Sequence, residues 1–520
     1  MVLDNLAILL PLLLVNVLCS VALATFGLHL YFLAWMYRRR VDTVRRSQSE
    51  LIDRFQKQAP EDAWPVVTTQ IPIYNELFVA RRVIQAVARM DYPAGRHEVQ
   101  VLDDSDDDTR AVVDRTAAEL RKKGFDVKVI RRSTRVGFKA GALAAGLEVC
   151  RGELIAIFDA DFVPGKDFLR RAVPLLLSDP RACCAQGRWA HINADESWLT
   201  RAQSMGIDGH FGIEQGARGW NDFFMNFNGT AGIWRKEAIL DPAVGGWSGD
   251  TITEDLDLSY RAQMAGWKIV YCIDLPCPAE LPAHIHALKT QQRRWAKGSI
   301  QTAIKLLPQL WGAKIPLSHK IEGTIHLTHY LVAVGMVVLP LVSPPLLLFW
   351  NLDHIGTWIW PLWTLIYFSS AAPPIVYAYS RYRLGGGLSG VKLAPLLMIL
   401  GIGLSLNNGI AAIAGMFQRG GTFERTPKAG DAGLAALATG PYQPLKNSLW
   451  IIEMALGTYC LLIGLTFMLA DRSWASSYLL LNGVSLLTVG WISSPWMRIA
   501  PAGPAGQQEP ENSLLEVAAG

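Results

Sequence analysis

Charged residues are scarce in this sequence: Asp, Glu, Lys and Arg make up 18% of its 520 residues. The 49 basic and 45 acidic side chains nearly balance, and the net charge of +4 is too small to indicate a nucleic-acid-binding protein. The 7 cysteines form neither a disulfide framework nor a Cys-x-x-Cys zinc pair. With a mean hydropathy of +0.20, the low charge excludes a disordered chain and argues against a purely soluble one.

The first long segment without charge covers residues 6–37, which contain no Asp, Glu, Lys or Arg. It exceeds the roughly 20 residues that a helix needs to cross a bilayer, and it is too long for the core of a signal peptide. Arg38, Arg39 and Arg40 follow it directly. Because arginines concentrate on the cytosolic side of a span, we expect residues 1–40 to be a transmembrane anchor with the N-terminus outside.

The next part of the chain, residues 41–316, is expected to be a cytosolic α/β domain. Short apolar runs typical of strands and mixed stretches typical of helices alternate along it, the strands at 64–73, 98–102, 126–130 and 154–158 and the helices at 108–123 and 141–150. Strands separated by helices predict parallel pairing in a doubly wound sheet. Ligands bind outside the carboxyl ends of the strands in such sheets, so acidic residues there become candidates for a site.

Residues 317–500 are apolar again and predict a second membrane region. Its long apolar stretches cover 324–350, 358–379, 450–470 and 477–496. A further candidate, 392–416, is interrupted by Ser405, Asn407 and Asn408, and buried amides are costly in lipid unless they are paired.

The basic residues of this region help to orient it. They place both the loop at 380–392 and the loop at 418–428 in the cytosol. One full crossing between these loops would put one of them on the wrong side, so we expect 392–416 to be an interfacial or re-entrant helix. About five crossings then remain, with the C-terminus inside. The tail 501–520, rich in Pro, Gly, Gln and Glu, is expected to be disordered.

Paired carboxylates follow two of the predicted strands. Asp159 and Asp161 end one of them, and Asp103 and Asp104 end another. Two carboxylates at this spacing can bind one hard divalent cation, Mg²⁺ or Mn²⁺, which also binds phosphate oxygens, although a solvated turn is an alternative. The acids at 106–108 are interpreted as caps of the next helix, which leaves Asp103 and Asp104 to face a ligand.

Glu254 and Asp255 stand before an amphipathic stretch. They could simply begin a helix, with Thr253 as its cap. In a transferase, a carboxylate there would be a general base, because an attacking sugar hydroxyl must lose its proton.

Gln291, Arg294 and Trp295 combine a planar donor group with a large aromatic ring. An aromatic face suits the C–H face of a sugar, whereas Arg and Gln suit phosphate and hydroxyl groups. The alternative is an interfacial membrane anchor.

Taken in order, these motifs resemble those of the family-2 glycosyltransferases, in the processive cellulose-synthase-like branch and nearest to the plant mannan and glucan synthases. The matching stretches are 70–76, 101–105, 135–143, 159–161, 186–189, 227–232, 253–255 and 291–295. The resemblance covers nearly half of the chain. It implies a GT-A-type, Rossmann-like domain and an inverting hexosyltransferase that uses a nucleotide-sugar.

The resemblance also implies roles for single residues. The residues expected to hold the donor are Tyr74, Glu76, Asp103, Asp104, Lys139, Asp159 and Asp161, of which Asp159 and Asp161 would bind Mg²⁺ or Mn²⁺. Asp255 is the expected catalytic base, with Glu254 beside it. The expected platform for the acceptor and diphosphate consists of Gly229, Thr230, Gln291, Arg294 and Trp295.

Residues 417–430 contain a further match, in which Phe423, Thr426 and Lys428 fit the gating loop of processive synthases. The chain departs from cellulose synthase in having Arg425 where that enzyme has a small apolar residue. The alternative is a basic loop that touches lipid headgroups.

These features together predict an integral membrane glycosyltransferase. It is expected to transfer hexose from UDP-glucose or GDP-mannose to a growing β-glycan, and to export that glycan across the lipid bilayer. The first alternative is a non-processive transferase that acts on a membrane lipid and makes a glycolipid. The second, a transporter or scaffold with a degenerate transferase domain, conflicts with the complete set of acids. The initiating acceptor, the oligomeric state and any accessory subunits stay open.

Overall fold

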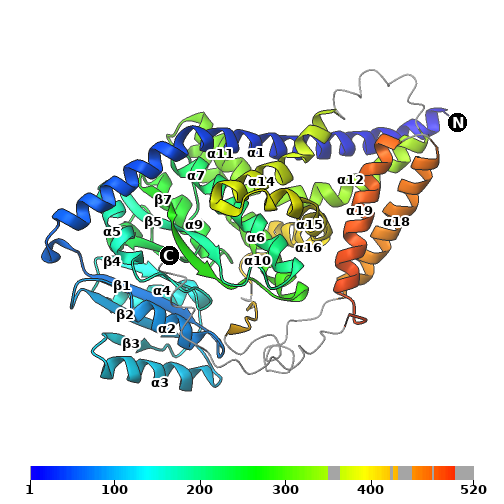
Figure 1. Ribbon diagram of the computed structural model, residues 1–520. Coiled ribbons are helices and arrows are strands. Elements are labelled where there is room, and N and C mark those ends of the chain that lie inside the picture. Colours follow the sequence, from blue (N-terminus) through cyan, green and yellow to red (C-terminus); the bar gives the residue numbers. More distant parts are fainter. Residues whose placement is uncertain (1, 350–363, 422–424, 431–447, 471–472, 498–520) are drawn as a thin grey trace.

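The computed structural model describes residues 2–349, 364–421, 425–430, 448–470 and 473–497 (Figure 1). An α/β domain lies against a set of long helices, and helix α1 (Val2–Gln58) runs over both parts (Figure 1). The predicted tail 501–520 and Phe423 of the predicted gating loop lie outside the described residues.

A mixed sheet of seven strands forms the α/β domain, in the order β3-β2-β1-β4-β6-β5-β7. The strands are β1 (Val67–Ile73), β2 (His97–Asp103), β3 (Val127–Ile130), β4 (Leu154–Ile157), β5 (Ala182–His191), β6 (Gly232–Arg235) and β7 (Lys268–Ala279). The α/β fold class is confirmed, and β1 to β4 pair in parallel as predicted. They coincide with the four predicted strands because apolar runs that end in polar residues mark buried strands.

The sheet also contains a strand that the sequence did not predict, because β6 is antiparallel to both β4 and β5. The loop before β6 stays at the carboxyl edge of the sheet, where the Asp159 N–H donates to Thr230 Oγ1 at 3.0 Å. The chain therefore enters β6 from that edge, and Gly232 pairs with Ile157 at the end of β4.

The helices of the domain pack on the sheet and support its carboxyl edge. They are α2 (Ala80–Ala88), α3 (Thr109–Lys122), α4 (Phe138–Glu148), α5 (Phe168–Leu177), α6 (Trp198–Gly209), α7 (Gln215–Gly219), α8 (Lys236–Leu240), α9 (Glu254–Met264) and α10 (Ile285–Gly312). A π-helical turn, His210–Glu214, joins α6 to α7. Of these helices, the sequence predicted α3, α4 and the amphipathic helix after Thr253, which is α9.

Helix α1 continues without a break past the predicted anchor boundary at residue 40. Its second half is fixed to the α/β domain: Arg45 forms an ion pair with Asp274 at 2.7 Å, and Gln48 Nε2 donates to the Tyr271 carbonyl at 2.9 Å. The apolar half and the domain-bound half therefore belong to one continuous helix.

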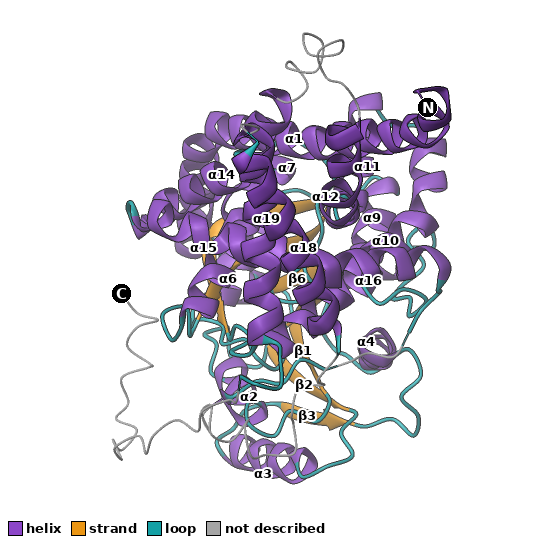
Figure 2. Cartoon of the chain, turned by 90° about the vertical axis from the view of Figure 1, so that its right-hand side faces the viewer, coloured by secondary structure: helices purple, strands orange, loops and turns teal. Residues whose placement is uncertain are grey.

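The C-terminal part is helical. Its helices are α11 (Leu317–Thr328), α12 (Leu331–Phe349), α14 (Ala372–Arg381), α15 (Ser389–Gly403), α16 (Ser405–Phe417), α18 (Leu449–Leu469) and α19 (Ser473–Ile492). Figure 2 shows these helices gathered on one side of strands β1, β2 and β3. Helix α18 packs along α19, and α16 packs along α10.

Within the described residues, 3 helices are long and apolar enough to cross a membrane: α1, α12 and α18. The pair α15–α16 would make a fourth if it is one span, and it is bent by 45°. The break falls at the predicted polar interruption, where Asn407 Nδ2 donates to the Lys289 carbonyl at 3.1 Å. A bent pair suits a broken span as well as a re-entrant one, so the re-entrant placement and the about five crossings stay predictions.

A buried ion pair fixes α10 to the apolar helix α18. Lys289 Nζ lies 2.7 Å from Glu453 Oε2, and their side chains are 1% and 0% exposed. Breaking a buried pair from one side leaves an uncompensated charge, which costs about 3–5 kcal/mol.

We therefore expect Lys289→Met alone to lower the thermal unfolding temperature of the purified full-length protein strongly. The double variant Lys289→Met with Glu453→Met should regain most of the loss, because no charge is then left unpaired. Fluorescence-monitored unfolding in detergent measures both. A double variant as unstable as the single one would show that the pair contributes by packing rather than by charge.

Candidate functional site

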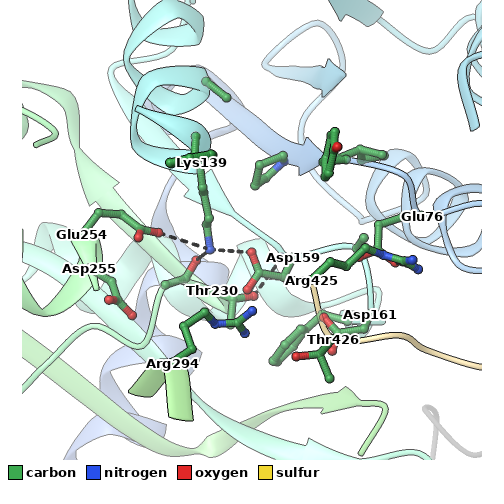
Figure 3. A pocket seen from close by; sticks show the side chains of 18 of the residues that line it. Glu76, Lys139, Asp159, Asp161, Thr230, Glu254, Asp255, Arg294, Arg425 and Thr426 are labelled. Carbon is green, nitrogen blue, oxygen red and sulfur yellow. Dashed lines mark hydrogen bonds and ion pairs between the residues drawn. The ribbon is translucent and has the colours of Figure 1, made fainter. Parts of the chain in front are cut away.

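One cavity lies at the carboxyl ends of the sheet strands (Figure 3). Its walls come from the ends of β1, β2 and β4, the loop before β6, the starts of α4 and α9, helix α10 and residues 425–428. The predicted site residues that line it are Tyr74, Glu76, Asp104, Lys139, Asp159, Asp161, Gly229, Thr230, Glu254, Asp255, Gln291, Arg294, Trp295, Thr426 and Lys428. Residues far apart in the sequence thus share one site.

Lys139 lies at the centre of the cavity and points at its acidic wall (Figure 3). Its Nζ is 2.5 Å from Asp159 Oδ1, donates to the Gly229 carbonyl at 2.8 Å and lies 3.8 Å from Glu254 Oε1. Burial opposes the charge on Lys139, but Asp159 and Glu254 outweigh burial and raise its pKa. The side chain is therefore a fixed positive charge.

Asp159 and Asp161 both face the cavity, and each has a lysine partner. Burial raises the pKa of Asp159 although Lys139 acts against it. Lys428 Nζ lies 2.7 Å from Asp161 Oδ2. Among the described residues, no group of three or more His, Cys, Asp or Glu side chains is arranged to hold a metal. Two carboxylates still suit a hard divalent cation whose remaining positions are filled by phosphate oxygens and water.

Glu254 and Asp255 begin α9 at the opposite wall. Burial is the main cause that raises both pKa values, to about 7 for Glu254. Thr253 stands at the cap position but makes no side-chain capping bond, and it contacts Thr302 of α10 at 3.1 Å instead. The two acids are therefore more than helix-starting residues, because both face the cavity with raised proton affinity.

Gly229 brings the loop before β6 against these charged groups. Its φ of +77° is a conformation that other residues rarely adopt. A Cβ atom there would lie 3.0 Å from Asp255 Oδ2 and 3.1 Å from Lys139 Nζ. Only glycine therefore lets the backbone carbonyl approach Lys139 without crowding the catalytic candidates.

Two arginines that received no role from the sequence shape the wall beside Tyr74. The Arg135 guanidinium stacks over the Tyr74 ring, 3.1 Å from the ring centroid. Arg132 pairs with Asp104 through two nitrogens, one of them Nε at 3.1 Å from Oδ1. The sequence signal for them was the run of basic residues that begins at Arg131, because this run follows β3 directly and β3 lies beside β2, which ends at the predicted acids.

Asp103 differs from the other predicted residues, because it is not among those that line the cavity. It is 2% exposed, accepts from Arg131 Nε at 2.8 Å and accepts from the Ser105 N–H at 3.1 Å. Its contacts hold the end of β2 rather than a ligand. Among the acids expected to cap α3, Asp107 accepts from the Thr109 N–H at 2.9 Å.

Helix α10 supplies one side of the cavity with Gln291, Arg294 and Trp295. Burial lowers the pKa of Arg294, although the nearby acids act to raise it. The Trp295 ring meets the Trp189 ring edge-on, with centroids 6.1 Å apart. These side chains line the cavity, so their arrangement differs from that of an interfacial anchor.

The structure describes residues 417–421 and 425–430 of the predicted gating loop, and Arg425, Thr426 and Lys428 line the same cavity. Arg425 forms an ion pair with Glu76 at 3.0 Å, and burial raises the pKa of Glu76 although Arg425 acts against it. Thr426 is 6% exposed and Lys428 is 4% exposed. Arg425, the departure from the cellulose synthase pattern, thus pairs with a partly buried carboxylate 349 positions away.

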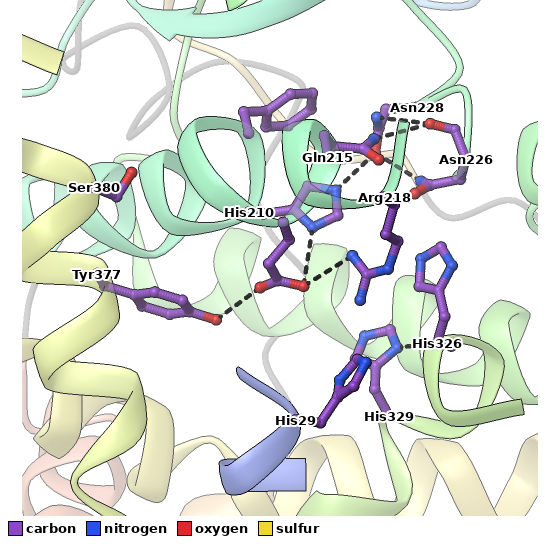
Figure 4. Close-up of polar contacts among 12 residues, drawn as sticks. His29, His210, Gln215, Arg218, Asn226, Asn228, His326, His329, Tyr377 and Ser380 are labelled. Carbon is purple, nitrogen blue, oxygen red and sulfur yellow. Dashed lines mark hydrogen bonds and ion pairs between the residues drawn. The ribbon is translucent and has the colours of Figure 1, made fainter. Parts of the chain in front are cut away.

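A polar cluster connects the cavity with the apolar helices (Figure 4). His210 Nε2 lies 3.3 Å from Oδ1 of Asn228, which lines the cavity. Tyr377 of α14 donates to Glu214 Oε1 at 3.2 Å, and Glu214 pairs with Arg218 at 3.2 Å. This cluster was not predicted, since its members come from separate segments of the chain.

The family model "Glycosyltransferase like family 2" matches residues 65–298. "Glucomannan 4-beta-mannosyltransferase 7" of Arabidopsis thaliana is 31% identical over 441 residues, which are 82% of this chain and 77% of that protein. "Glucomannan 4-beta-mannosyltransferase 1" of Cyamopsis tetragonoloba is 41% identical over 272 residues, which are 51% of each chain.

Among solved structures, a mannosyltransferase from Pyrobaculum calidifontis in complex with GDP-Man and Mn²⁺ is 20% identical. The match covers 72% of this chain and 97% of that one, with a TM-score of 0.43. The family model and the extended identity to the plant enzymes are the stronger findings. The chain belongs to the family-2 glycosyltransferases, in the cellulose-synthase-like group that includes the plant glucomannan 4-beta-mannosyltransferases.

Proposed function

We propose that the chain is a membrane-embedded, processive hexosyltransferase that extends a β-glycan from a nucleotide-sugar, GDP-mannose or UDP-glucose. The convergence of Lys139, Asp159, Asp161 and Asp255 on one cavity carries this proposal. The names of the plant relatives favour mannosyl transfer with a β-1,4 linkage. The catalytic domain is cytosolic and the N-terminus lies outside in this proposal, which the arginines after the first apolar segment support.

The proposed reaction is one displacement at the anomeric carbon, with inversion. The acceptor hydroxyl forms the new C–O bond, Asp255 takes its proton, and the nucleoside diphosphate leaves with the electron pair of the broken bond. Asp255 suits this task better than Glu254, because Glu254 lies 3.8 Å from the ammonium of Lys139. Asp255 instead places Oδ2 beside the Gly229 loop.

The departing diphosphate develops negative charge, which the fixed cations of the cavity would stabilise. Lys139 and Arg294 are partly buried in the cavity wall, where a charge acts more strongly than in water. Asp159 and Asp161 are the residues that would hold Mg²⁺ or Mn²⁺, which would supply further charge neutralisation at the diphosphate. Tyr74, Glu76 and Asp104 would face the nucleoside.

Export of the product is supported by the way the acceptor side joins the apolar helices. Helix α10 carries Trp295 and is fixed to α18 through the Lys289–Glu453 pair. The cluster around His210 and Glu214 provides polar groups between the cavity and α1, α11 and α14, as in Figure 4. A polar glycan needs such groups on its path out of the cavity.

The product distinguishes processive synthesis from the alternative of single addition to a lipid. The purified protein in lipid nanodiscs is incubated with Mn²⁺ or Mg²⁺ and with radiolabelled GDP-mannose or UDP-glucose. We expect a long polymer that a β-mannanase or β-glucanase degrades. Products with one added sugar that partition into organic solvent would contradict processivity and support the glycolipid alternative.

The role of Asp255 predicts a separation of binding from turnover. Asp255→Asn keeps the size of the side chain but removes its basicity, so the turnover rate should fall about 10²–10⁴-fold. The dissociation constant of the nucleoside diphosphate, measured by calorimetry, should differ by no more than about two-fold from that of the unmodified protein. Normal polymer formation by this variant would refute the assignment of the base.

The raised pKa of Glu254 predicts a dependence on pH. A carboxylate with a pKa of about 7 is protonated below that pH and anionic above it. Protonation removes a negative neighbour of Asp255 and makes Asp255 a weaker base, so kcat/KM should fall as the pH drops through about 7.

Glu254→Gln is neutral at every pH and supplies the control for this dependence. Its plateau activity should be lower, and the inflection near pH 7 should be absent. An acid limb at the same pH in both proteins would assign the titration to another group.

A further inference from the structure

Glu280 follows directly after β7, at the point where this strand contacts the acidic loop of the cavity. The Val163 N–H donates to the Pro278 carbonyl at 2.9 Å, and the Glu280 N–H donates to the Asp161 carbonyl at 3.2 Å. The backbone of Glu280 is therefore fixed to the backbone of Asp161.

The Glu280 carboxylate holds a different segment. It accepts from the Ala429 N–H at 2.6 Å and from the Gly430 N–H at 3.1 Å, and it pairs with Arg82 of α2 at 2.9 Å. Glu280 is 5% exposed, and it is not among the residues that line the cavity. A buried carboxylate with three charge-assisted contacts is a strong local anchor.

The same residue also contacts the side chain that reaches Asp161. Lys428 Nζ donates to the Glu280 carbonyl and lies 2.7 Å from Asp161 Oδ2. Gly430 lies so close to the loop before α2 that a Cβ atom there would be 2.2 Å from the Phe78 carbonyl oxygen. Residues 428–430 are thus tightly docked, because Glu280 contacts all three of them.

We propose that Glu280 is the positioning residue that docks residues 428–430 at the end of β7 and thereby aims Lys428 at the cation and diphosphate side of the cavity. This inference rests on the proposed function, because it assigns Lys428 to the donor. Without the Glu280 carboxylate, the N–H groups of Ala429 and Gly430 lose their charged acceptor, and buried N–H groups are costly to leave unpaired. A substitution of Glu280 would therefore undock residues 428–430 although Glu280 itself does not line the cavity.

The test measures binding of GDP and UDP, each with Mn²⁺, to the full-length protein in nanodiscs. Glu280→Ala should weaken binding of the preferred nucleotide about 10-fold or more, because buried charge-assisted hydrogen bonds are lost. Glu280→Gln can still accept from both N–H groups and should show a smaller loss. Hydrogen exchange of the amides of residues 428–430 should rise in the same order.

A double variant separates positioning from a general effect on the fold. Lys428→Ala should weaken nucleotide binding, and adding Glu280→Ala to it should weaken binding no further, because Glu280 acts through Lys428. Arg81→Ala is the matched control: Arg81 lies on the same helix as Arg82 and pairs with Glu119 at 3.8 Å on the surface. It should bind nucleotide as the unmodified protein does.

Three results would overturn the inference. The first is unchanged nucleotide binding by Glu280→Ala. If the alanine variant does not fold, unchanged nucleotide binding and unchanged amide exchange in Glu280→Gln take its place. The second is a double variant whose loss is the product of the single losses. The third is an unmodified protein that binds neither nucleotide, which would also refute the proposed function, whereas the first two leave that function standing.

Discussion

The site depends on the neutralisation of carboxylates that the fold buries together. Six carboxylates line the cavity, Glu76, Asp104, Asp159, Asp161, Glu254 and Asp255, and five cationic side chains line it with them, Arg135, Lys139, Arg294, Arg425 and Lys428. An unpaired buried charge costs several kcal/mol, so the acids can stay ionised only if cations meet them. Lys139 meets Asp159, Lys428 meets Asp161 and Arg425 meets Glu76.

This charge balance also suits the proposed chemistry. A nucleoside diphosphate brings negative charge, and a divalent cation brings positive charge, so the two can enter together without upsetting the balance. Lys139 and Lys428, which pair with Asp159 and Asp161, then lie close enough to contact the diphosphate. Burial raises the pKa values of Glu254 and Asp255 although Lys139 acts against it, and a raised pKa is the property a base near neutral pH needs.

The sequence predicted the elements whose information is local. The apolar runs before Asp104 and Asp159 marked strands, and parallel strands place such acids at one edge of the sheet. The motif around Arg294 and Trp295 was found through its similarity to a known family. Local patterns failed where the partner is remote: the four-residue β6, the Arg425–Glu76 pair and the Glu280 anchor each depend on contacts between distant segments.

The sequence alone determined that the chain has apolar segments long enough for a membrane, an α/β domain and acids at the ends of its strands. These properties follow from hydrophobic periodicity and from charge, which are written in neighbouring residues. Only the tertiary structure decided which acids face the cavity and which, like Asp103, hold the fold. It also decided which cation neutralises each acid, because burial and pairing of charges depend on how segments hundreds of residues apart pack together.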